Sequence, residues 1–173
     1  MAKKLVILDA DAIIELHQLK KWGHALSSWT PVVPESVYRQ EAVYVSREFT
    51  KEHLTLGEDR DKGLIRVASA GISELQAVTD FLGDRFKERI HHGELEGLAL
   101  VRKMDPQKTG NPLFCTGDRQ AILALCCLDM SANAVSLQEL IAPSHTGLQD
   151  HFCKERLQMV IEEGLVIRME HYM

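Results

Sequence analysis

Carboxylate side chains follow two short apolar runs of this sequence, at points where buried strands would end. Asp9 comes directly after the apolar run 5–8, and Asp118 follows the run 113–116. In parallel α/β folds, ligands bind outside the carboxyl ends of the strands. Carboxylate oxygens are also the ligands that Mg²⁺ and Mn²⁺ prefer. A metal ion held by such residues would suit phosphodiester hydrolysis, because it polarises the phosphate and activates a water.

Three further acids extend this set. Glu41 is expected on a helix over residues 35–49, whereas Glu94 and Glu96 are expected where a helix begins after Gly93. Each acid also has an ordinary structural interpretation. Asp9 or its neighbour Asp11 could cap the following helix, as Asp commonly does, and Glu41 could be a solvated or ion-paired helix residue. It is the joint placement of the acids that favours a shared site.

The elements that would position these acids alternate between strands and helices along the chain. Apolar runs predict strands over 5–8, 30–34, 64–68, 113–116 and 134–137. Helical periodicity predicts helices over 11–21, 35–49, 73–86, 93–104 and 119–130, with a short helix or loop over 22–29 and the start of another helix over 138–141. This alternation predicts a three-layer α/β/α sandwich around a central, mainly parallel sheet of four or five strands.

The chain divides into a main domain and a C-terminal extension. Residues 1–143 are predicted to form the main domain, and 144–173 a helical extension packed on it. Within the extension we expect an amphipathic helix over 148–163 and a terminal strand over 165–169. This helix could seal the core or pair two copies of the chain across an axis, and the pattern leaves both open.

Composition narrows the classes of function. The chain has 173 residues, 45% hydrophobic and 26% charged, which suits one domain with a substantial core. No apolar run approaches the roughly 18 residues that a membrane span needs, so we expect a cytoplasmic protein without membrane contact. The net charge of −5 argues against a broad basic nucleic-acid surface, but not against a small acidic metal site.

Neither the cysteines nor the paired histidines predict a zinc site. The four cysteines, at 115, 126, 127 and 153, lack the spacing of a zinc site or a disulfide framework, and burial is expected for all of them. His91 and His92 adjoin Glu94, but no suitably spaced third nitrogen or sulfur ligand follows them.

The segments around the acids resemble the motifs of the PIN-domain nucleases, a family that includes the toxins of toxin–antitoxin pairs. The resemblance extends from about residue 4 to residue 140. Four segments match. Segment 6–11 contains a strand that ends at Asp9, and segment 33–42 contains Glu41. Segment 93–100 contains Glu96, and segment 114–119 contains Thr116 and Asp118.

The resemblance implies a PIN-like fold and a metal-dependent endoribonuclease that uses Mg²⁺ or Mn²⁺. It implies that Asp9, Glu96 and Asp118 bind the ion directly and that Glu41 binds it directly or through water. Glu94 would support the site, and Thr116 would orient Asp118 or a bound water. RNA is then the substrate, with an antitoxin and a second copy of the chain as possible partners.

This sequence departs from the family pattern at Asp11, where family members carry a neutral Asn or Ser. The additional negative charge could tighten metal binding or repel a phosphate. The acidic composition and the C-terminal extension are also unlike the smallest toxins of the family.

Two other functions fit parts of the same pattern. Asp9-Ala10-Asp11 is similar to the Asp-x-Asp motif of haloacid-dehalogenase-like phosphatases, with Asp118 as their late acid, although no second acid follows within 119–125. A PIN-like scaffold without activity, which only binds a protein partner, is the non-enzymatic alternative.

Overall fold

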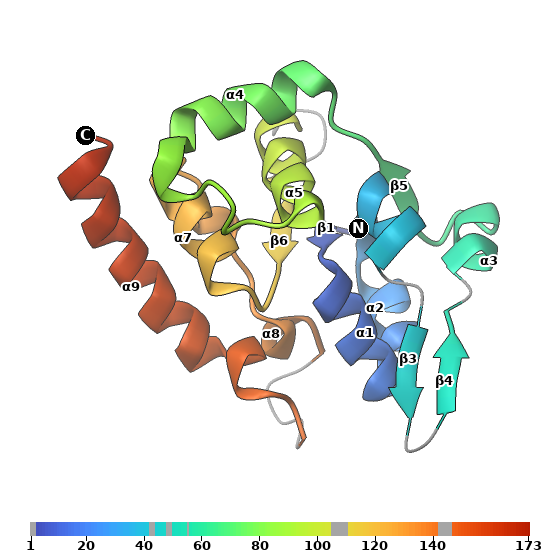
Figure 1. Ribbon diagram of the computed structural model, residues 1–173. Helices are drawn as coiled ribbons and strands as arrows, with labels where there is room; N and C mark the ends of the chain where they lie inside the picture. Colours follow the sequence, from blue (N-terminus) through green and yellow to red (C-terminus); the bar gives the residue numbers. More distant parts are fainter. Residues whose placement is uncertain (1–2, 42–43, 48–49, 55, 105–110, 142–146) are drawn as a thin grey trace.

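The computed structural model describes residues 3–41, 44–47, 50–54, 56–104, 111–141 and 147–173, with only the backbone described at 41, 44–47 and 50–53 (Figure 1). Its main sheet contains β1 (Leu5–Leu8), β2 (Thr30–Pro34), β5 (Arg66–Ala68) and β6 (Leu113–Cys115) in the order β5-β2-β1-β6. All three strand pairs are parallel. The prediction of an α/β fold with a parallel sheet is confirmed, and the carboxyl ends of these strands lie at one edge.

The central strand β1 is buried on both faces of the sheet. Leu5 and Ile7 belong to one hydrophobic cluster, whereas Val6 and Leu8 belong to another. Because successive side chains of a strand point to opposite faces, a strand covered on both sides reads as a continuous apolar run. This is why the four residues carry no polar alternation.

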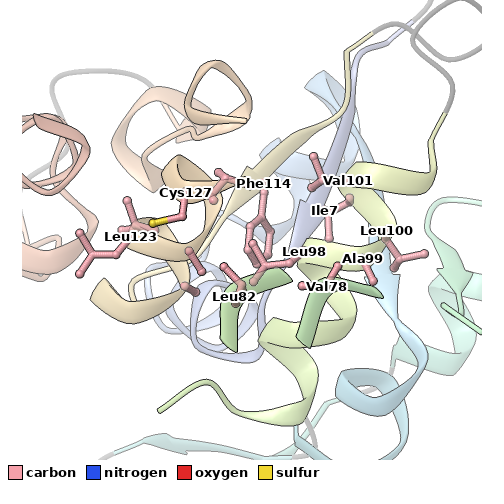
Figure 2. Close-up of a cluster of buried hydrophobic side chains, with 14 of the residues drawn as sticks. Ile7, Val78, Leu82, Leu98, Ala99, Leu100, Val101, Phe114, Leu123 and Cys127 are labelled. Atoms are coloured by element: carbon pink, nitrogen blue, oxygen red, sulfur yellow. The ribbon is translucent and has the colours of Figure 1, made fainter. Parts of the chain in front are cut away.

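Helices cover both faces. Figure 2 shows the first cluster, where Ile7 of β1 and Phe114 of β6 pack with Leu98. The helices that contribute to it are α4 (Ile72–Leu82), α5 (His92–Lys103), α7 (Arg119–Cys127) and α9 (Lys154–His171). The second cluster is formed with α1 (Ala10–Gln18), α2 (Trp22–Ser28) and α8 (Leu137–Ile141). Two helical layers around one sheet are consistent with a three-layer sandwich.

The remaining elements are short. They are the π-helix η1 (Val37–Glu41), β3 (Tyr44–Arg47), β4 (Thr50–His53), α3 (Leu56–Asp61) and the 3₁₀ helices η2 (Gly83–Arg85), η3 (Ser131–Asn133) and η4 (Asp150–Phe152). No helix in the described ranges combines the length and apolar character that crossing a membrane requires.

The prediction of a helix over 35–49 is correct only as far as Glu41. The helical segment stops with η1 at Glu41, and β3 then pairs with β4 as an antiparallel hairpin in which Tyr44 faces His53 and Arg47 faces Thr50. Aromatic and β-branched residues such as Tyr44 favour strands, and the hairpin satisfies backbone groups that an isolated strand would leave unpaired. Pairing between neighbouring strands therefore determines the structure here, although the sequence pattern is also compatible with a helix.

The predictions of strands over 134–137 and 165–169 are also wrong. Ala134 makes a single parallel bridge to Phe114, after which α8 begins at Leu137. The strand expected over 165–169 is part of α9, which continues to His171. Within the helix, the backbone groups of these residues are satisfied by hydrogen bonds of the helix itself.

Helix α9 packs along α7 and shares the core of the sheet (Figure 1). Leu157, Val160 and Ile167 are buried in the first cluster. The two helices approach each other closely at Gly164, where an added Cβ would lie 2.7 Å from Cβ of Cys126. The extension thus contributes side chains to the same hydrophobic core as the strands.

Three of the four cysteines are buried, as expected, and all four are free thiols. Burial raises the pKa of Cys115 far above its ordinary value and raises the pKa of Cys126 to about 12. Both therefore remain neutral thiols at physiological pH. Cys153 is only partly buried, so the expectation of burial is wrong there.

Candidate functional site

Asp9, Thr116 and Asp118 lie together where β1 and β6 end. These strands are neighbours, and the N–H of Asp9 donates to the carbonyl of Cys115 at 3.2 Å. The hydroxyl of Thr116 donates to Oδ2 of Asp9 at 2.8 Å and accepts from the backbone N–H of Asp118 at 3.0 Å. One hydroxyl therefore fixes the carboxylate after β1 relative to the loop after β6.

Both aspartates also cap helices. Oδ1 of Asp9, which is 4% exposed, accepts from the N–H of Ala10 at 2.6 Å at the start of α1. Oδ1 of Asp118 accepts from the N–H of Ala121 at 2.8 Å at the start of α7. Asp118 is more exposed, and its Oδ2 has no hydrogen-bond partner among the described residues. Capping thus leaves one oxygen of Asp118 for another ligand.

Glu96 lies on α5 and reaches the ends of the other two strands. Its Oε2 accepts from the N–H of Ser36 at 2.9 Å and from the Ser36 hydroxyl at 2.6 Å. Its Oε1 accepts from the N–H of Ala70 at 3.1 Å. Ser36 follows β2 and Ala70 follows β5, so this carboxylate is fixed at the same edge of the sheet as Asp9.

The hydrogen bonds around Glu96 keep it ionised. Burial alone would raise the pKa of this carboxyl, but the bonds donated by Ser36, Ala70 and Ser69 outweigh burial and hold the pKa below its ordinary value. All of these donors are neutral, and no Lys, Arg or His of the described residues forms an ion pair with Glu96. A buried negative charge therefore remains at this edge without a cationic partner.

The other three acids have different surroundings. Glu94 is 7% exposed and accepts from the N–H of His91 at 2.7 Å in a capping box at the start of α5. Asp11 is exposed in the first turn of α1. Glu41 ends η1, and its side chain lies outside the part of the chain that the structure describes.

The donor type at this edge fits a hard divalent cation, because carboxylate oxygens suit Mg²⁺ and Mn²⁺. Within the described residues, however, no group of three or more His, Cys, Asp or Glu side chains lies close enough to hold a metal ion. The described acids form separate arrangements, with Asp9 and Asp118 linked by Thr116, and Glu96 held by Ser36 and Ala70. The predicted ligand set is therefore only partly assembled by them.

Sequence reasoning missed two residues that contact this edge. Ser36 lies two residues after Pro34, which ends β2, and a hydroxyl residue just after a buried strand is a signal that could have identified it. His151 packs against the backbone of Gly117, between Thr116 and Asp118. Nothing in the local sequence pattern predicts this contact, because it depends on how the C-terminal extension folds back.

A polar hollow adjoins Glu96. The side chains that line it include Glu35, Ser36, Arg39, Ser69 and His92. Its guanidinium, from Arg39, is paired with Glu35 at 2.5 Å and is largely exposed. The hollow offers polar groups of both signs next to the buried carboxylate.

Comparison of the chain with protein-family models, with curated proteins and with solved structures gave no match.

Proposed function

We propose that this chain is a metal-dependent endoribonuclease whose site lies at the carboxyl edge of the parallel sheet. The observation that carries the proposal is the Thr116 hydroxyl, which links the carboxylate of Asp9 to the loop of Asp118. Its partners are the side chain of Asp9 and the backbone N–H of Asp118, so one hydroxyl ties together the residues that follow β1 and β6. The PIN-like fold and an antitoxin partner rest on the resemblance of the motifs alone, whereas a homodimer and a cytoplasmic location are expectations from other features of the sequence.

In this proposal Asp9, Asp118 and Glu96 hold Mg²⁺ or Mn²⁺, with Glu41 beside them. When bound, the ion would polarise the phosphate and lower the pKa of a water. Asp118 supplies an oxygen that is not used in capping, and Thr116 keeps that residue next to Asp9. Glu96 supplies negative charge that the surrounding neutral donors orient but do not cancel.

The phosphatase alternative has less support. The late acidic motif of such phosphatases carries a second acid, and none follows Asp118 within 119–125. The inactive scaffold is favoured by one observation, the lack of a three-ligand group among the described residues. The experiment below decides between the scaffold and the nuclease.

The test compares wild-type protein with Asp118→Asn. Asn is as good an N-cap as Asp, so the variant should keep α7 and the melting temperature while losing a carboxylate ligand. We expect calorimetry to show Mn²⁺ binding to the wild type, and the variant to lose about tenfold or more in metal affinity and in cleavage of single-stranded RNA. Asp84→Asn, at an exposed acid in η2, is the matched control and should match the wild type.

Folded wild-type protein that neither binds Mn²⁺ or Mg²⁺ nor cleaves RNA would refute the nuclease and favour the scaffold. Binding and cleavage that Asp118→Asn leaves intact would refute the assigned site.

A further inference from the structure

We propose that His151 is a substrate-binding residue of this site, where its imidazole donates a hydrogen bond to a phosphate oxygen of single-stranded RNA. The proposal rests on the endoribonuclease function proposed above and extends the site to the C-terminal extension.

The ring of His151 lies directly on the loop that joins the two predicted site residues after β6. A Cβ added to Gly117 would overlap this ring, at 3.0 Å from its Nε2, and would lie 2.9 Å from Cε1 of Phe152. Gly117 is the residue between Thr116 and Asp118. The imidazole therefore occupies the space that any side chain at position 117 would need.

The residues on either side of His151 hold it in this position. Phe152 is 2% exposed in the second hydrophobic cluster, and its ring centroid lies 4.3 Å from that of His151. On the other side, the N–H of Gln149 donates to Oε1 of Glu15 at 3.3 Å, and its side-chain Nε2 donates to Oε2 at 2.9 Å. Glu15 is itself buried in α1 at 3% exposure.

The segment between α8 and α9 is anchored at both the backbone and a side chain of Gln149. A buried carboxylate that accepts two hydrogen bonds from one residue fixes both the backbone and the side chain of Gln149. Figure 1 shows the segment leading into α9, whose first N–H, at Lys154, donates to Gln138 of α8 at 2.8 Å. The imidazole is thus preorganised, which lowers the ordering cost of binding a ligand.

A phosphate approaching this edge needs a hydrogen-bond donor, because the carboxylates there repel it. Arg119 directly follows Asp118 in the sequence, but its guanidinium is already paired with Glu163 of α9. His151 is only partly buried, and no hydrogen bond involves its ring nitrogens within the described part of the chain. One ring nitrogen of a neutral imidazole carries a hydrogen, so His151 can donate without being charged.

The test separates the nitrogen atoms of the ring from its packing. His151→Phe keeps a planar ring against Gly117 and removes both nitrogens, whereas His151→Gln restores a side-chain N–H donor. His24→Phe is the matched control, because His24 is exposed and lies away from the site. It belongs to α2, where the carbonyl of Leu26 accepts a hydrogen bond from Lys3, which precedes the opposite end of β1. Each protein is melted, titrated in EDTA with a fluorescein-labelled single-stranded RNA and assayed for cleavage with Mn²⁺.

We expect His151→Phe to melt like the wild type and to bind the RNA on the order of tenfold more weakly, as the loss of one good hydrogen bond predicts. KM for cleavage should rise with the loss of binding, His151→Gln should recover part of the affinity, and His24→Phe should match the wild type.

Two outcomes would overturn the role of His151 while leaving the nuclease intact. In the first, His151→Phe binds and cleaves like the wild type. In the second, its loss of binding is accompanied by a lower melting temperature and is not recovered in His151→Gln. Wild-type protein that neither binds nor cleaves RNA would instead refute the nuclease, and the inference with it.

Discussion

At the scale of single residues, the hydroxyl groups near the sheet edge determine how its carboxylates are held. Ser36 and Thr116 each donate to a buried acid, at 2.6 Å to Glu96 and at 2.8 Å to Asp9. Neither hydroxyl brings a positive charge, so both orient an acid without neutralising it. Such an arrangement stabilises the ionised carboxylate through hydrogen bonds and leaves its charge available to a cation.

The contribution of the Ser36 hydroxyl to stability can be measured through the pH dependence of the free energy of unfolding. Removing the hydroxyl in Ser36→Ala leaves Glu96 with one donor fewer, and we expect the free energy of unfolding at pH 7 to fall by about 1–3 kcal/mol. The pKa of Glu96 in the folded protein lies below its ordinary value of 4.5. The stabilisation is therefore present above that pH and is lost as the pH falls through the folded pKa.

Urea unfolding of Ser36→Ala and wild type at pH 7 and at pH 3 tests this expectation. The difference between the two proteins should be larger at pH 7. Ser73→Ala is the control, because Ser73 donates to the carboxylate of Glu74 on an exposed surface, and it should change stability little at either pH. A difference for Ser36→Ala that is equal at both pH values would show that the hydroxyl stabilises the fold independently of the charge on Glu96.

At the scale of elements, two helical glycines stand where neighbouring elements come closest. A Cβ at Gly97 of α5 would lie 2.8 Å from the ring of Phe114 in β6. A Cβ at Gly164 of α9 would lie 2.7 Å from Cβ and 2.8 Å from Sγ of Cys126 in α7. Glycine ordinarily weakens a helix, so its presence at these positions reflects packing between elements.

The packing of α9 on α7 gives a prediction at this scale. Ala is favoured over Gly in a helix by roughly 1 kcal/mol, so Gly23→Ala in α2, where no atom lies within 4 Å of the new Cβ, should raise the melting temperature. Gly164→Ala should lower it, because the overlap with the backbone-proximal Cβ of Cys126 outweighs the helix propensity. Thermal unfolding followed by circular dichroism measures both. Equal stabilisation of the two variants would contradict the close packing of α9 on α7.

Strands of the parallel sheet were predictable because their burial leaves a local pattern. The run Leu5–Leu8 and the proline-bounded Thr30–Pro34 are short, continuous and apolar, as strands covered on both faces must be. The hairpin of β3 and β4 was not predictable in this way. The residues of β3 also fit a helical repeat, and the choice between strand and helix depends on the pairing of Tyr44 with His53 in β4.

In the candidate site, too, residues with a local sequence signal were predictable, whereas contacts between distant segments were not. Asp9 and Asp118 could be identified from the strands they follow, and the caps that they form are equally local. The contact between His151 and Gly117 depends on the anchoring of Gln149 by Glu15, across 134 positions of sequence. No periodicity within the extension carries that information, so this part of the site required the structure.

At the scale of the whole molecule, the acidic charge limits how RNA can be bound. The chain carries 20 Lys and Arg against 25 Asp and Glu, and several of its cations are already paired with acids, among them Arg39, Arg119 and Arg168. A broad electrostatic surface for the phosphate backbone needs free basic residues in excess. The proposed nuclease should therefore contact only a few phosphates, close to the sheet edge.

The salt dependence of RNA binding measures how many phosphates are neutralised by positively charged side chains. For single strands, the logarithm of the binding constant falls with the logarithm of the salt concentration by about 0.7 for each phosphate neutralised. Two or three neutralised phosphates would give a slope of about −1.4 to −2.1, whereas six to ten would give about −4 to −7. The measurement is made in EDTA with the labelled RNA used for His151, so that cleavage does not interfere.

A slope steeper than about −5 would mean that RNA lies along a basic surface away from the carboxylates. In that case the net charge of −5 would not limit RNA binding to the sheet edge, and exposed lysines and arginines, not His151, would make most of the contacts to the RNA.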